Sequence, residues 1–217
     1  RMRKRLGELG IPCPRNAIVE SLDEVQAFGF PCVLKTTKGG YDGKGVWIVR
    51  DRADARSVVD AAAVKGATLL AGELVDFRRG LSALIARSPS GQVAAWPVVQ
   101  TTQRDSICHE VIAPAPDLDP DLGDRALQIA MTICGELDVV GVMAVELFET
   151  TDGRVLVNEL AMRPHNTGHW TQDGAITSQF ENHLRAVLDL PLGAPQPRAP
   201  WTVMVNILGG AQDAGQL

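Results

Sequence analysis

The first third of the chain alternates between two hydrophobic periods. Apolar residues at helical spacing predict helices at residues 2–9, 21–28 and 51–65. Short apolar runs between them predict strands at residues 18–19, 31–36, 46–50 and 68–70. Ser21 or Asp23 could cap the second helix, and Gly66 closes the third. This interleaving of helices and strands indicates a mixed α/β protein.

Longer apolar stretches follow in the rest of the chain. They predict strands at residues 81–87, 93–100, 140–149 and 154–160. Ser88–Gly91 is a strong turn signal between the first two, and Thr151–Gly153 separates the last two. Asp119 and Pro120 open a helix that we expect to reach about Leu137.

A capping box, Ser178-x-x-Glu181, predicts one more helix near the end of the chain. Apolar residues recur behind it at helical spacing. We expect the buried stripe of this helix to be Phe180, Leu184, Val187 and Leu188. Pro191 ends the helix.

The two ends of the chain suggest a fragment. Residues 194–200 are proline-rich and look like a linker, and residues 203–208 predict a strand with no visible partner. The chain opens on Arg1 and not on methionine. We therefore expect neighbouring domains on both sides. The basic residues near Arg1 favour the solvated face of a helix over a binding arm.

Composition narrows the classes of function. The 217 residues are 45% hydrophobic, enough for one sizeable core or for two small lobes that share a hinge. The net charge of −5 gives no reason to expect nucleic acid or an anionic membrane as a partner. No apolar stretch reaches the roughly 18 residues that span a bilayer, and the sequence shows no signal-peptide pattern. The cysteines form no CxxC pair, so we expect reduced thiols in a cytoplasmic protein.

Two glutamates in the predicted hairpin at residues 140–160 carry the most specific chemical signal. A turn centred on Asp152 and Gly153 places Glu146 directly opposite Glu159. Their neighbours on that face are apolar: Ala144, Phe148 and Val157. Like charges so placed destabilise each other, so the pair calls for a hard cation, Mg²⁺ or Mn²⁺. The alternative is a slipped register that leaves both glutamates in water.

Asn158 precedes the second of these glutamates. Its amide could add an oxygen ligand or hold a phosphate. Strict alternation points it to the other face of the hairpin, however, so this role requires that the strand bends.

The segment GGYDGKG, residues 39–45, lies between two predicted strands. Its glycines let backbone N–H groups approach an anion, and Lys44 adds charge. No Ser or Thr follows Lys44 and no helix begins there, so it is not a Walker A loop. We interpret it as a flap over phosphates, with an ordinary glycine-rich hairpin as the alternative. Lys35 favours the flap, because a lysine flanked by Val33 and Leu34 is costly without an anion.

The third cluster is RPHNTGH, residues 163–169, directly after the second glutamate strand. The guanidinium, imidazole and amide of Arg163, His165 and Asn166 suit an anionic, hydrogen-bonding substrate. The spacing of His165 and His169 also suggests zinc, but a proline and a glycine disfavour a helix and no third soft ligand is near. A purely structural loop remains an alternative.

Together these motifs resemble one enzyme family. The segments concerned are VLKTTKGGYDGKGV, WPVVQTTQRDSICHEVIAPAP, GVMAVELFETTDGRVLVNELAMRPHNTGHWT and TSQFENHLRAVLDLPLG. They resemble 5-(carboxyamino)imidazole ribonucleotide synthases, which are ATP-grasp enzymes, over about residues 10–209. The resemblance implies carboxylation of 5-aminoimidazole ribonucleotide by ATP and bicarbonate in purine biosynthesis. The reaction would pass through carboxyphosphate and release ADP and phosphate.

The resemblance also implies the fold. We expect the α/β (α+β) class: an ATP-grasp domain at residues 1–193 whose two lobes have antiparallel sheets that enclose ATP. The small lobe would cover about residues 1–72 and the large lobe about residues 73–193. Residues 194–217 would be a linker and the start of a truncated carboxy-terminal domain, and an amino-terminal Rossmann-like domain would be missing. The family is usually homodimeric.

Roles for individual residues follow from the resemblance. The metal, Mg²⁺ or Mn²⁺ in its place, would be bound by Glu146, Glu159 and Asn158. The nucleotide would be bound by Lys35, Gly40, Tyr41, Asp42, Gly43, Lys44, Gly45, Val46, Gly72, Glu73, Leu74, Val75, Gly80, Asn158 and Glu159. The catalytic set would be Tyr41, Asp42, Lys44, Arg163 and His165. The substrate would contact Arg163, His165 and Asn166.

Four positions depart from the family's pattern. Lys44 stands where arginine is more frequent, and Met162 replaces a usual proline. Gly72 and Gly80 stand where the family commonly has glutamates, at the adenine hinge and the ribose. We expect the two glycines to weaken ATP binding without changing the fold. We also expect Gly80→Glu to fit if the backbone follows the family's path, because glycine has no side chain that would clash.

Two other functions stay open. One is another purine-type ATP-grasp ligase, such as a formate-using transformylase. The other, motivated by Gly72 and Gly80, is a nucleotide-binding module with little catalysis.

Overall fold

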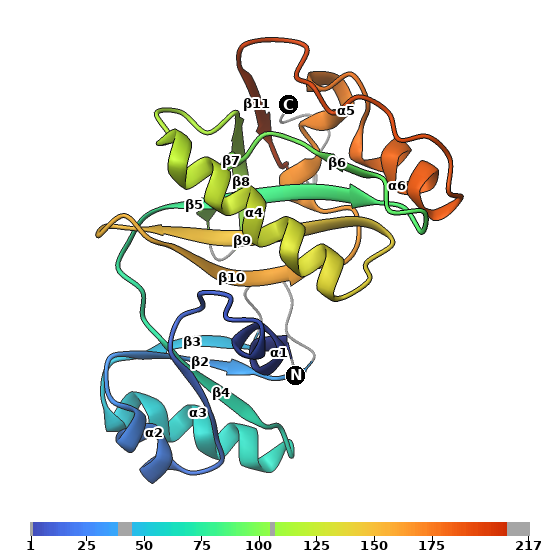
Figure 1. The fold of residues 1–217 in the computed structure, drawn as a ribbon. Helices are drawn as coiled ribbons and strands as arrows, with labels where there is room; N and C mark the ends of the chain where they lie inside the picture. The colour runs from blue at the N-terminus through green and yellow to red at the C-terminus, as the bar shows by residue number, and fades with distance from the viewer. Residues whose placement is uncertain (1, 39–44, 105–106, 208–217) are drawn as a thin grey trace, which may run out of the picture.

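The computed structural model describes residues 2–38, 45–104 and 107–207, which form two lobes with a cleft between them (Figure 1). Each lobe has its own antiparallel sheet and its own hydrophobic core. None of the helices in these described ranges is long and apolar enough to cross a membrane.

The small lobe has a four-stranded sheet with the order β1-β4-β2-β3. Its elements are β1 (Asn16–Val19), α2 (Leu22–Phe28), β2 (Cys32–Thr36), β3 (Val46–Val49), α3 (Arg52–Val64) and β4 (Leu69–Glu73). Both helices lie on one side of the sheet, away from the large lobe (Figure 1). Cys32 and Leu34 of β2 are buried beneath them, so the alternate residues Val33 and Lys35 face the cleft.

The large lobe has a seven-stranded sheet with the order β10-β9-β5-β7-β8-β11, and a short strand, β6, pairs with β5. Its strands are β5 (Phe77–Arg87), β6 (Val93–Ala95), β7 (Val99–Arg104), β8 (Ile107–Ala113), β9 (Gly141–Thr150), β10 (Val155–Ala161) and β11 (Thr202–Val205). Its helices are α1 (Met2–Glu8), α4 (Pro120–Glu136), the 3₁₀ turn η1 (Asn166–Gly168), α5 (Thr171–Gly174) and α6 (Gln179–Val187).

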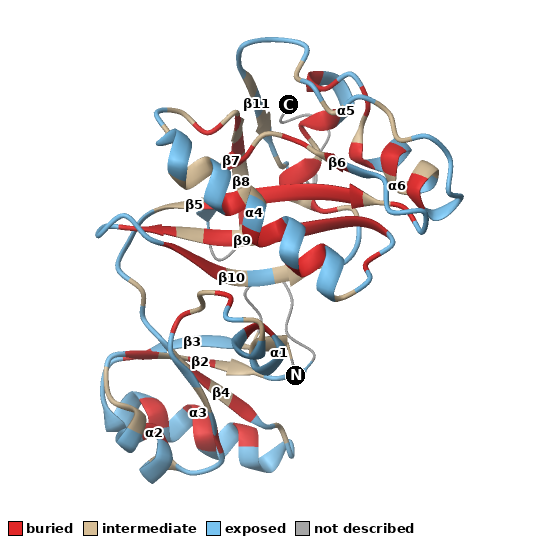
Figure 2. Cartoon of the chain, viewed as in Figure 1, coloured by how far each residue is buried: buried red, intermediate tan, exposed pale blue. Residues whose placement is uncertain are grey.

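Strands β5 and β9 form the buried centre of this lobe (Figure 2). Leu81 and Ala83 of β5 pack in the core beneath α4, and the alternate residues Leu84 and Ala86 pack in a second core on the opposite face. Covered on both faces, these strands read as continuous apolar runs, which is why the sequence predicted them well.

Helix α1 belongs to the large lobe. Leu6 is fully buried in the core beneath α4, together with Ile11. The small-lobe sheet begins only at Asn16. The predicted small-lobe boundary at residue 1 therefore differs from the packing.

Two predicted strands need correction, and one strand was missed. The run 93–100 is broken into β6 and β7, with the buried Trp96 between them and Pro97 unable to donate a ladder hydrogen bond. Strand β8 was not predicted. It pairs with β11, so the strand expected to have no visible partner does have one, with Met204 opposite Val111.

Helix α6 differs most from its prediction. The cap is confirmed, because Ser178 Oγ accepts a hydrogen bond from the Glu181 N–H at 3.2 Å. The expected buried stripe is wrong: its members are 40–66% exposed, at Phe180, Leu184, Val187 and Leu188. The residues that α6 buries are Gln179, Asn182 and Ala186. Two of these three are polar, because the inner face of α6 meets the backbone of neighbouring loops.

Candidate functional site

A cleft of about 1070 Å³ separates the two lobes. The small lobe lines it with apolar residues of β2 and β3 and with Lys35. The large lobe lines it with β5, β7, β9, β10 and the loop that follows β10. The cleft brings together Lys35, Glu146, Asn158, Glu159, Arg163, His165 and Asn166, which were predicted as site residues from separate motifs.

The predicted pairing of Glu146 with Glu159 is confirmed, but for a reason that the turn alone did not contain. The turn is three residues long, with the Thr150 N–H bonded to the Arg154 carbonyl, so the register near it pairs Leu147 with Val157. Continued without a break, that register would place Asn158 opposite Glu146. A bulge between Val157 and Glu159 shifts it by one residue and brings the two glutamates together.

The same bulge turns Asn158 toward the glutamates. Its Oδ1 accepts a hydrogen bond from Lys35 Nζ at 3.2 Å, across the two lobes. Asn158 can therefore lie on the same face as the glutamates, which the sequence analysis allowed only if the strand bends. Because of the bulge, the prediction that Val157 lies beside the glutamates is wrong. Val157 is buried in the core on the α4 side of the sheet.

The pKa shift of Glu146 in this cluster indicates buried negative charge, which a bound cation would neutralise. Burial raises the pKa of Glu146 to about 7, and the charge of Glu159 adds to the rise. Lys35, a hydrogen bond from Asn158 and Arg163 oppose it only in part. Burial lowers the pKa of Lys35, as does Arg3, against the opposing charges of Glu159 and Glu146. A divalent ion would relieve the repulsion between the carboxylates.

The loop after β10 lies beside the carboxylates. His165 is 8% exposed, and its Nε2 lies 3.7 Å from Glu146 Oε1. The Oδ1 of Asn166 is buried and has no hydrogen-bond partner among the described residues. Arg163 is exposed, and its guanidinium donates to the Pro164 carbonyl at 2.9 Å. The loop thus offers the cleft a cation, an imidazole and an open amide acceptor.

Comparison with known proteins shows to which family this two-lobed chain belongs. Residues 4–180 match the sequence profile of the ATP-grasp domain. The chain belongs to the ATP-grasp family. Two sheets on either side of a cleft that gathers lysine, glutamates and asparagine are therefore the two lobes of an ATP-grasp domain, as predicted.

Individual relatives extend the match. An N5-carboxyaminoimidazole ribonucleotide synthase of Mycobacterium tuberculosis is 58% identical over 215 residues, which are 97% of this chain and 50% of that protein. An Aspergillus clavatus N5-carboxyaminoimidazole synthase, crystallised with ADP and 5-aminoimidazole ribonucleotide, matches with a TM-score of 0.86 and 31% identity, over 96% of this chain and 56% of its own. A crystal structure of an N5-carboxyaminoimidazole ribonucleotide synthetase in complex with ADP matches with a TM-score of 0.88 and 38% identity. The match covers 95% of this chain and 55% of that protein. The chain spans about half the length of these relatives, and the predicted resemblance is confirmed.

The carboxylate cluster of this ATP-grasp domain has the donor set for Mg²⁺. Glu146, Glu159 and Asn158 present hard oxygen atoms. Among the described residues no three His, Cys, Asp or Glu side chains gather in a group that could hold a metal. The zinc alternative fails, because His169 stacks on Phe180 at a centroid distance of 5.9 Å while His165 faces Thr167 and Glu146.

Gly72 and Gly80, which the resemblance predicts beside the nucleotide, both line the cleft. A Cβ atom on Gly72 would meet only the Val33 carbonyl, at 3.8 Å. On Gly80 it would lie 2.6 Å from Thr101 Oγ1 and 3.2 Å from the Thr101 carbonyl oxygen. The expectation that Gly80→Glu would fit is therefore wrong unless Thr101 moves. Of the other predicted hinge residues, Glu73 accepts a hydrogen bond from the Arg15 N–H at 3.1 Å.

Five predicted residues of the flap, Gly40, Tyr41, Asp42, Gly43 and Lys44, lie outside the described residues. Gly45 and Val46, which follow them, lead into β3, and Val46 lines the cleft. Leu74 and Val75 line the cleft where the chain passes from β4 to β5.

Arg3 was missed by sequence reasoning, which placed the basic run of α1 in solvent. Its guanidinium donates to the carbonyls of Val157 and Asn158, the second at 2.6 Å, and so brackets the bulge. Phe77 and Phe148, whose stacked rings are 4.6 Å apart, also line the cleft. The alternation of β9 could have indicated Phe148, but nothing in the sequence signals the contact of Arg3 over more than 150 positions.

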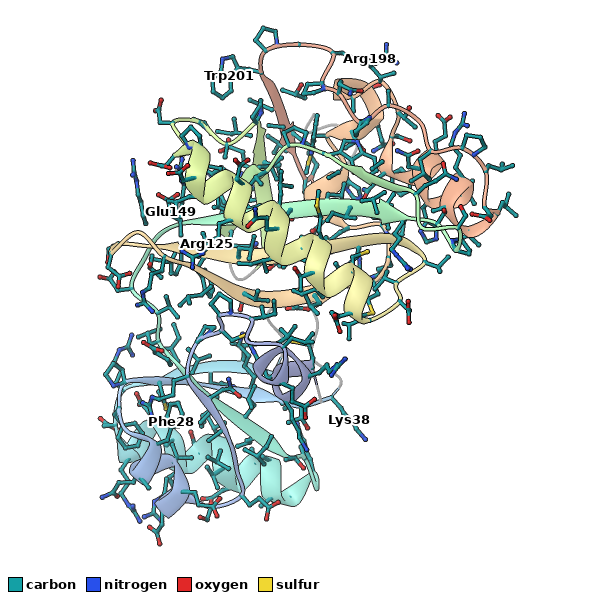
Figure 3. The ribbon with its side chains drawn as sticks, in the orientation of Figure 1. Phe28, Lys38, Arg125, Glu149, Arg198 and Trp201 are labelled. Atoms are coloured by element: carbon teal, nitrogen blue, oxygen red, sulfur yellow. The ribbon has the colours of Figure 1, made fainter. Side chains whose placement is uncertain are left out.

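A second carboxylate of β9 is structural. Glu149 lies near the end of β9 (Figure 3). It is 4% exposed, forms an ion pair with Arg79 and lies 3.6 Å from Arg78. Arg79 also donates to the carbonyls of Pro116 and Asp117. The pair therefore fixes the loop before α4 to the end of β5, and we assign it no chemical role.

Proposed function

We propose that the protein containing this chain carboxylates the exocyclic amine of 5-aminoimidazole ribonucleotide, using ATP and bicarbonate and releasing ADP and phosphate. One observation carries the proposal: the Glu146–Glu159 pair and the His165–Asn166 loop meet in a single cleft. The relatives that share this fold bear the synthase name, and one of them holds ADP together with the aminoimidazole substrate. We carry that substrate over to this chain as part of the proposal.

The carboxylates and Lys35 would serve the phosphates of ATP. Glu146, Glu159 and Asn158 would hold Mg²⁺, which when bound screens the charge of the transferring phosphoryl group. Lys35 lies within hydrogen-bond reach of Asn158, so its ammonium can face both the metal ligands and an anion in the cleft. Burial lowers the pKa of Lys35 and so disfavours its charged form, and an anionic ligand in the cleft would offset that penalty.

The loop would serve the second substrate. Bicarbonate would attack the terminal phosphorus of ATP, which forms carboxyphosphate and releases ADP. The amine would then attack the carbonyl carbon, release phosphate and lose a proton. The open Oδ1 of Asn166 suits an N–H donor of the substrate, and Arg163 suits its negative charge. Enclosure between the lobes would protect carboxyphosphate from water.

The test is ADP release by the complete gene product with ATP, Mg²⁺ and bicarbonate, with and without 5-aminoimidazole ribonucleotide. We expect release to depend on both the ribonucleotide and bicarbonate. Release with formate in place of bicarbonate would favour the transformylase alternative, and nucleotide binding without turnover would favour the binding module. Dimer formation and the cytoplasmic location remain predictions, to be checked by light scattering and by fractionation.

A further inference from the structure

The backbone of His165 is held by one side chain at two points. Gln179 Oε1 accepts a hydrogen bond from the His165 N–H at 2.9 Å, and Gln179 Nε2 donates to the His165 carbonyl at 2.7 Å. The Gln179 residue is fully buried. A buried amide whose two ends both bond to one residue fixes the position of that residue, because neither group has water as a substitute partner.

The surrounding loop is built to admit this amide. A Cβ atom on Gly168 would lie 2.4 Å from Gln179 Oε1 and 2.9 Å from Leu84 Cδ2, so only glycine leaves the necessary space. Thr171 Oγ1 accepts from the Gln179 N–H at 2.9 Å and donates to the Gly168 carbonyl at 2.6 Å. The start of α6 is therefore tied to the loop at its backbone as well as through its side chain.

The imidazole ring is oriented by a second contact. Its Nδ1 lies 2.9 Å from Thr167 Oγ1, which in turn lies 2.8 Å from Ser82 Oγ. Ser82 is on β5, directly opposite Glu146 of β9. With Nδ1 engaged on this side, Nε2 is directed to Glu146 Oε1 at 3.7 Å.

We propose that Gln179 and Thr167 are positioning residues for His165, Gln179 through its backbone and Thr167 through its ring. This inference rests on the proposed function, in which the loop that contains His165 serves the aminoimidazole substrate. It also accounts for the orientation of α6. The helix turns polar residues inward because one of them holds a residue of the site, and its apolar residues remain on the outside.

The chain contains a matched control on the same helix. Asn182 is fully buried, its Oδ1 accepts from the Gly193 N–H at 2.7 Å, and its Nδ2 donates to the Gly193 carbonyl at 3.0 Å. The hydrogen-bond pattern is that of Gln179, but Gly193 is not among the residues that line the cleft. Loss of either amide should lower the melting temperature, whereas only loss of Gln179 should disturb His165.

The experiment compares Gln179→Met with Asn182→Leu in the complete gene product. We expect Gln179→Met to lower kcat for substrate-dependent ADP release by about 100-fold while the KM for ATP stays unchanged, because a small misplacement of a reacting group is enough for such a loss. Asn182→Leu should keep kcat close to wild type. Equal loss of kcat in both variants, or an unchanged kcat in Gln179→Met, would overturn the proposal.

Thr167 provides a second test that does not depend on the stability of the Gln179 variant. Thr167→Ser retains the hydroxyl and should retain kcat, whereas Thr167→Val removes it at similar volume and should lose most of kcat. Equal activity of the two would contradict the assignment to Thr167.

The ring position can also be measured without turnover. The imidazole NMR signals of His165 should shift in Gln179→Met and Thr167→Val but not in Asn182→Leu. If wild type released no ADP, the proposed function would fail, and these signals would still decide the positioning role. Unshifted signals in Gln179→Met and Thr167→Val would refute it.

Discussion

Strand pairs β2–β3 and β9–β10 face each other across the cleft, and they contribute unequal chemistry. β2–β3 is regular, without a shift in register, so every second residue of β2 reaches the cleft and Lys35 is its one charged member there. β9–β10 is interrupted by a bulge, which presents Asn158 and Glu159 in succession, opposite Glu146. A regular strand pair thus supplies a wall with one cation, and a bulged pair supplies a cluster of oxygen ligands.

The largest expected effect follows from removing one charge of the bulged pair. Glu159→Gln should lower turnover on the order of 1000-fold, because the metal loses a charged ligand at the transferring phosphoryl group. The metal-free fold should be as stable as wild type or slightly more so, because a like-charge contact is removed. Turnover and thermal melting in EDTA check both parts.

Glu136→Gln is the matched control for this change, because Glu136 lies on α4 at the surface, where it forms an ion pair with Arg5 at 3.6 Å. It should have normal turnover. Normal turnover of Glu159→Gln itself with Mg²⁺ would show that β9–β10 does not supply the ligands of the metal.

Glu146 should give the metal-free protein a distinct pH dependence. Its pKa is raised from 4.5 to about 7 in the folded state, so folded Glu146 retains a proton that the unfolded chain releases. Its contribution to the free energy of unfolding is complete below pH 4.5 and is lost as the pH rises through about 7. The loss amounts to at most about 3 kcal/mol. Denaturant titrations in EDTA should show this slope in wild type and not in Glu146→Gln, and an identical slope in both would contradict the assignment.

Arg163 tests whether the loop after β10 acts separately from the nucleotide. Arg163→Ala should reduce ADP release that depends on the aminoimidazole substrate by about 100-fold, since a charged contact to that substrate is lost. The affinity for ADP, measured by calorimetry, should stay unchanged. An equal loss of ADP affinity would mean that the loop and the carboxylates serve one ligand.

The smallest effect concerns Gly80, on the same wall as Glu146. Gly80→Ala should lower the free energy of unfolding by about 1 kcal/mol, because its Cβ would crowd Thr101. In a Thr101→Ala background, Gly80→Glu should tighten ATP roughly tenfold through the ribose hydroxyls. It should leave 2′,3′-dideoxy-ATP, which lacks those hydroxyls, unchanged. Equal tightening of both nucleotides would show that Gly80 does not face the ribose.

The sequence predicted most of the elements and the pairing of Glu146 with Glu159, because buried strands and side-chain caps are local signals. It could not predict the strand register and the bulge that produce this pairing. The turn is centred on Asp152 and not between Asp152 and Gly153, and the bulge at Asn158 compensates for the difference in register. The bulge has no local signal, since Arg3 stabilises it from the other end of the chain.

Helix α6 shows where hydrophobic patterning fails. A stripe such as Leu184 and Leu188 predicts burial only if the facing surface is apolar. Here part of the facing surface is loop backbone, which needs hydrogen-bond partners, and Gln179 and Asn182 provide them. Strand β8 was missed for a related reason: His109 and Glu110 interrupt its apolar alternation.

The packing of α1 has a consequence for the order in which the protein assembles during synthesis. Leu6 is buried against α4, whose Ile129 and Ile133 emerge from the ribosome more than 120 residues later. At about 5–20 residues per second this delay is on the order of ten seconds. The small lobe, residues 16–73, has its own core and is complete long before then. The small lobe can therefore fold before the large lobe, although α1 precedes it in the chain. Helix α1 can pack only when the core of the large lobe forms.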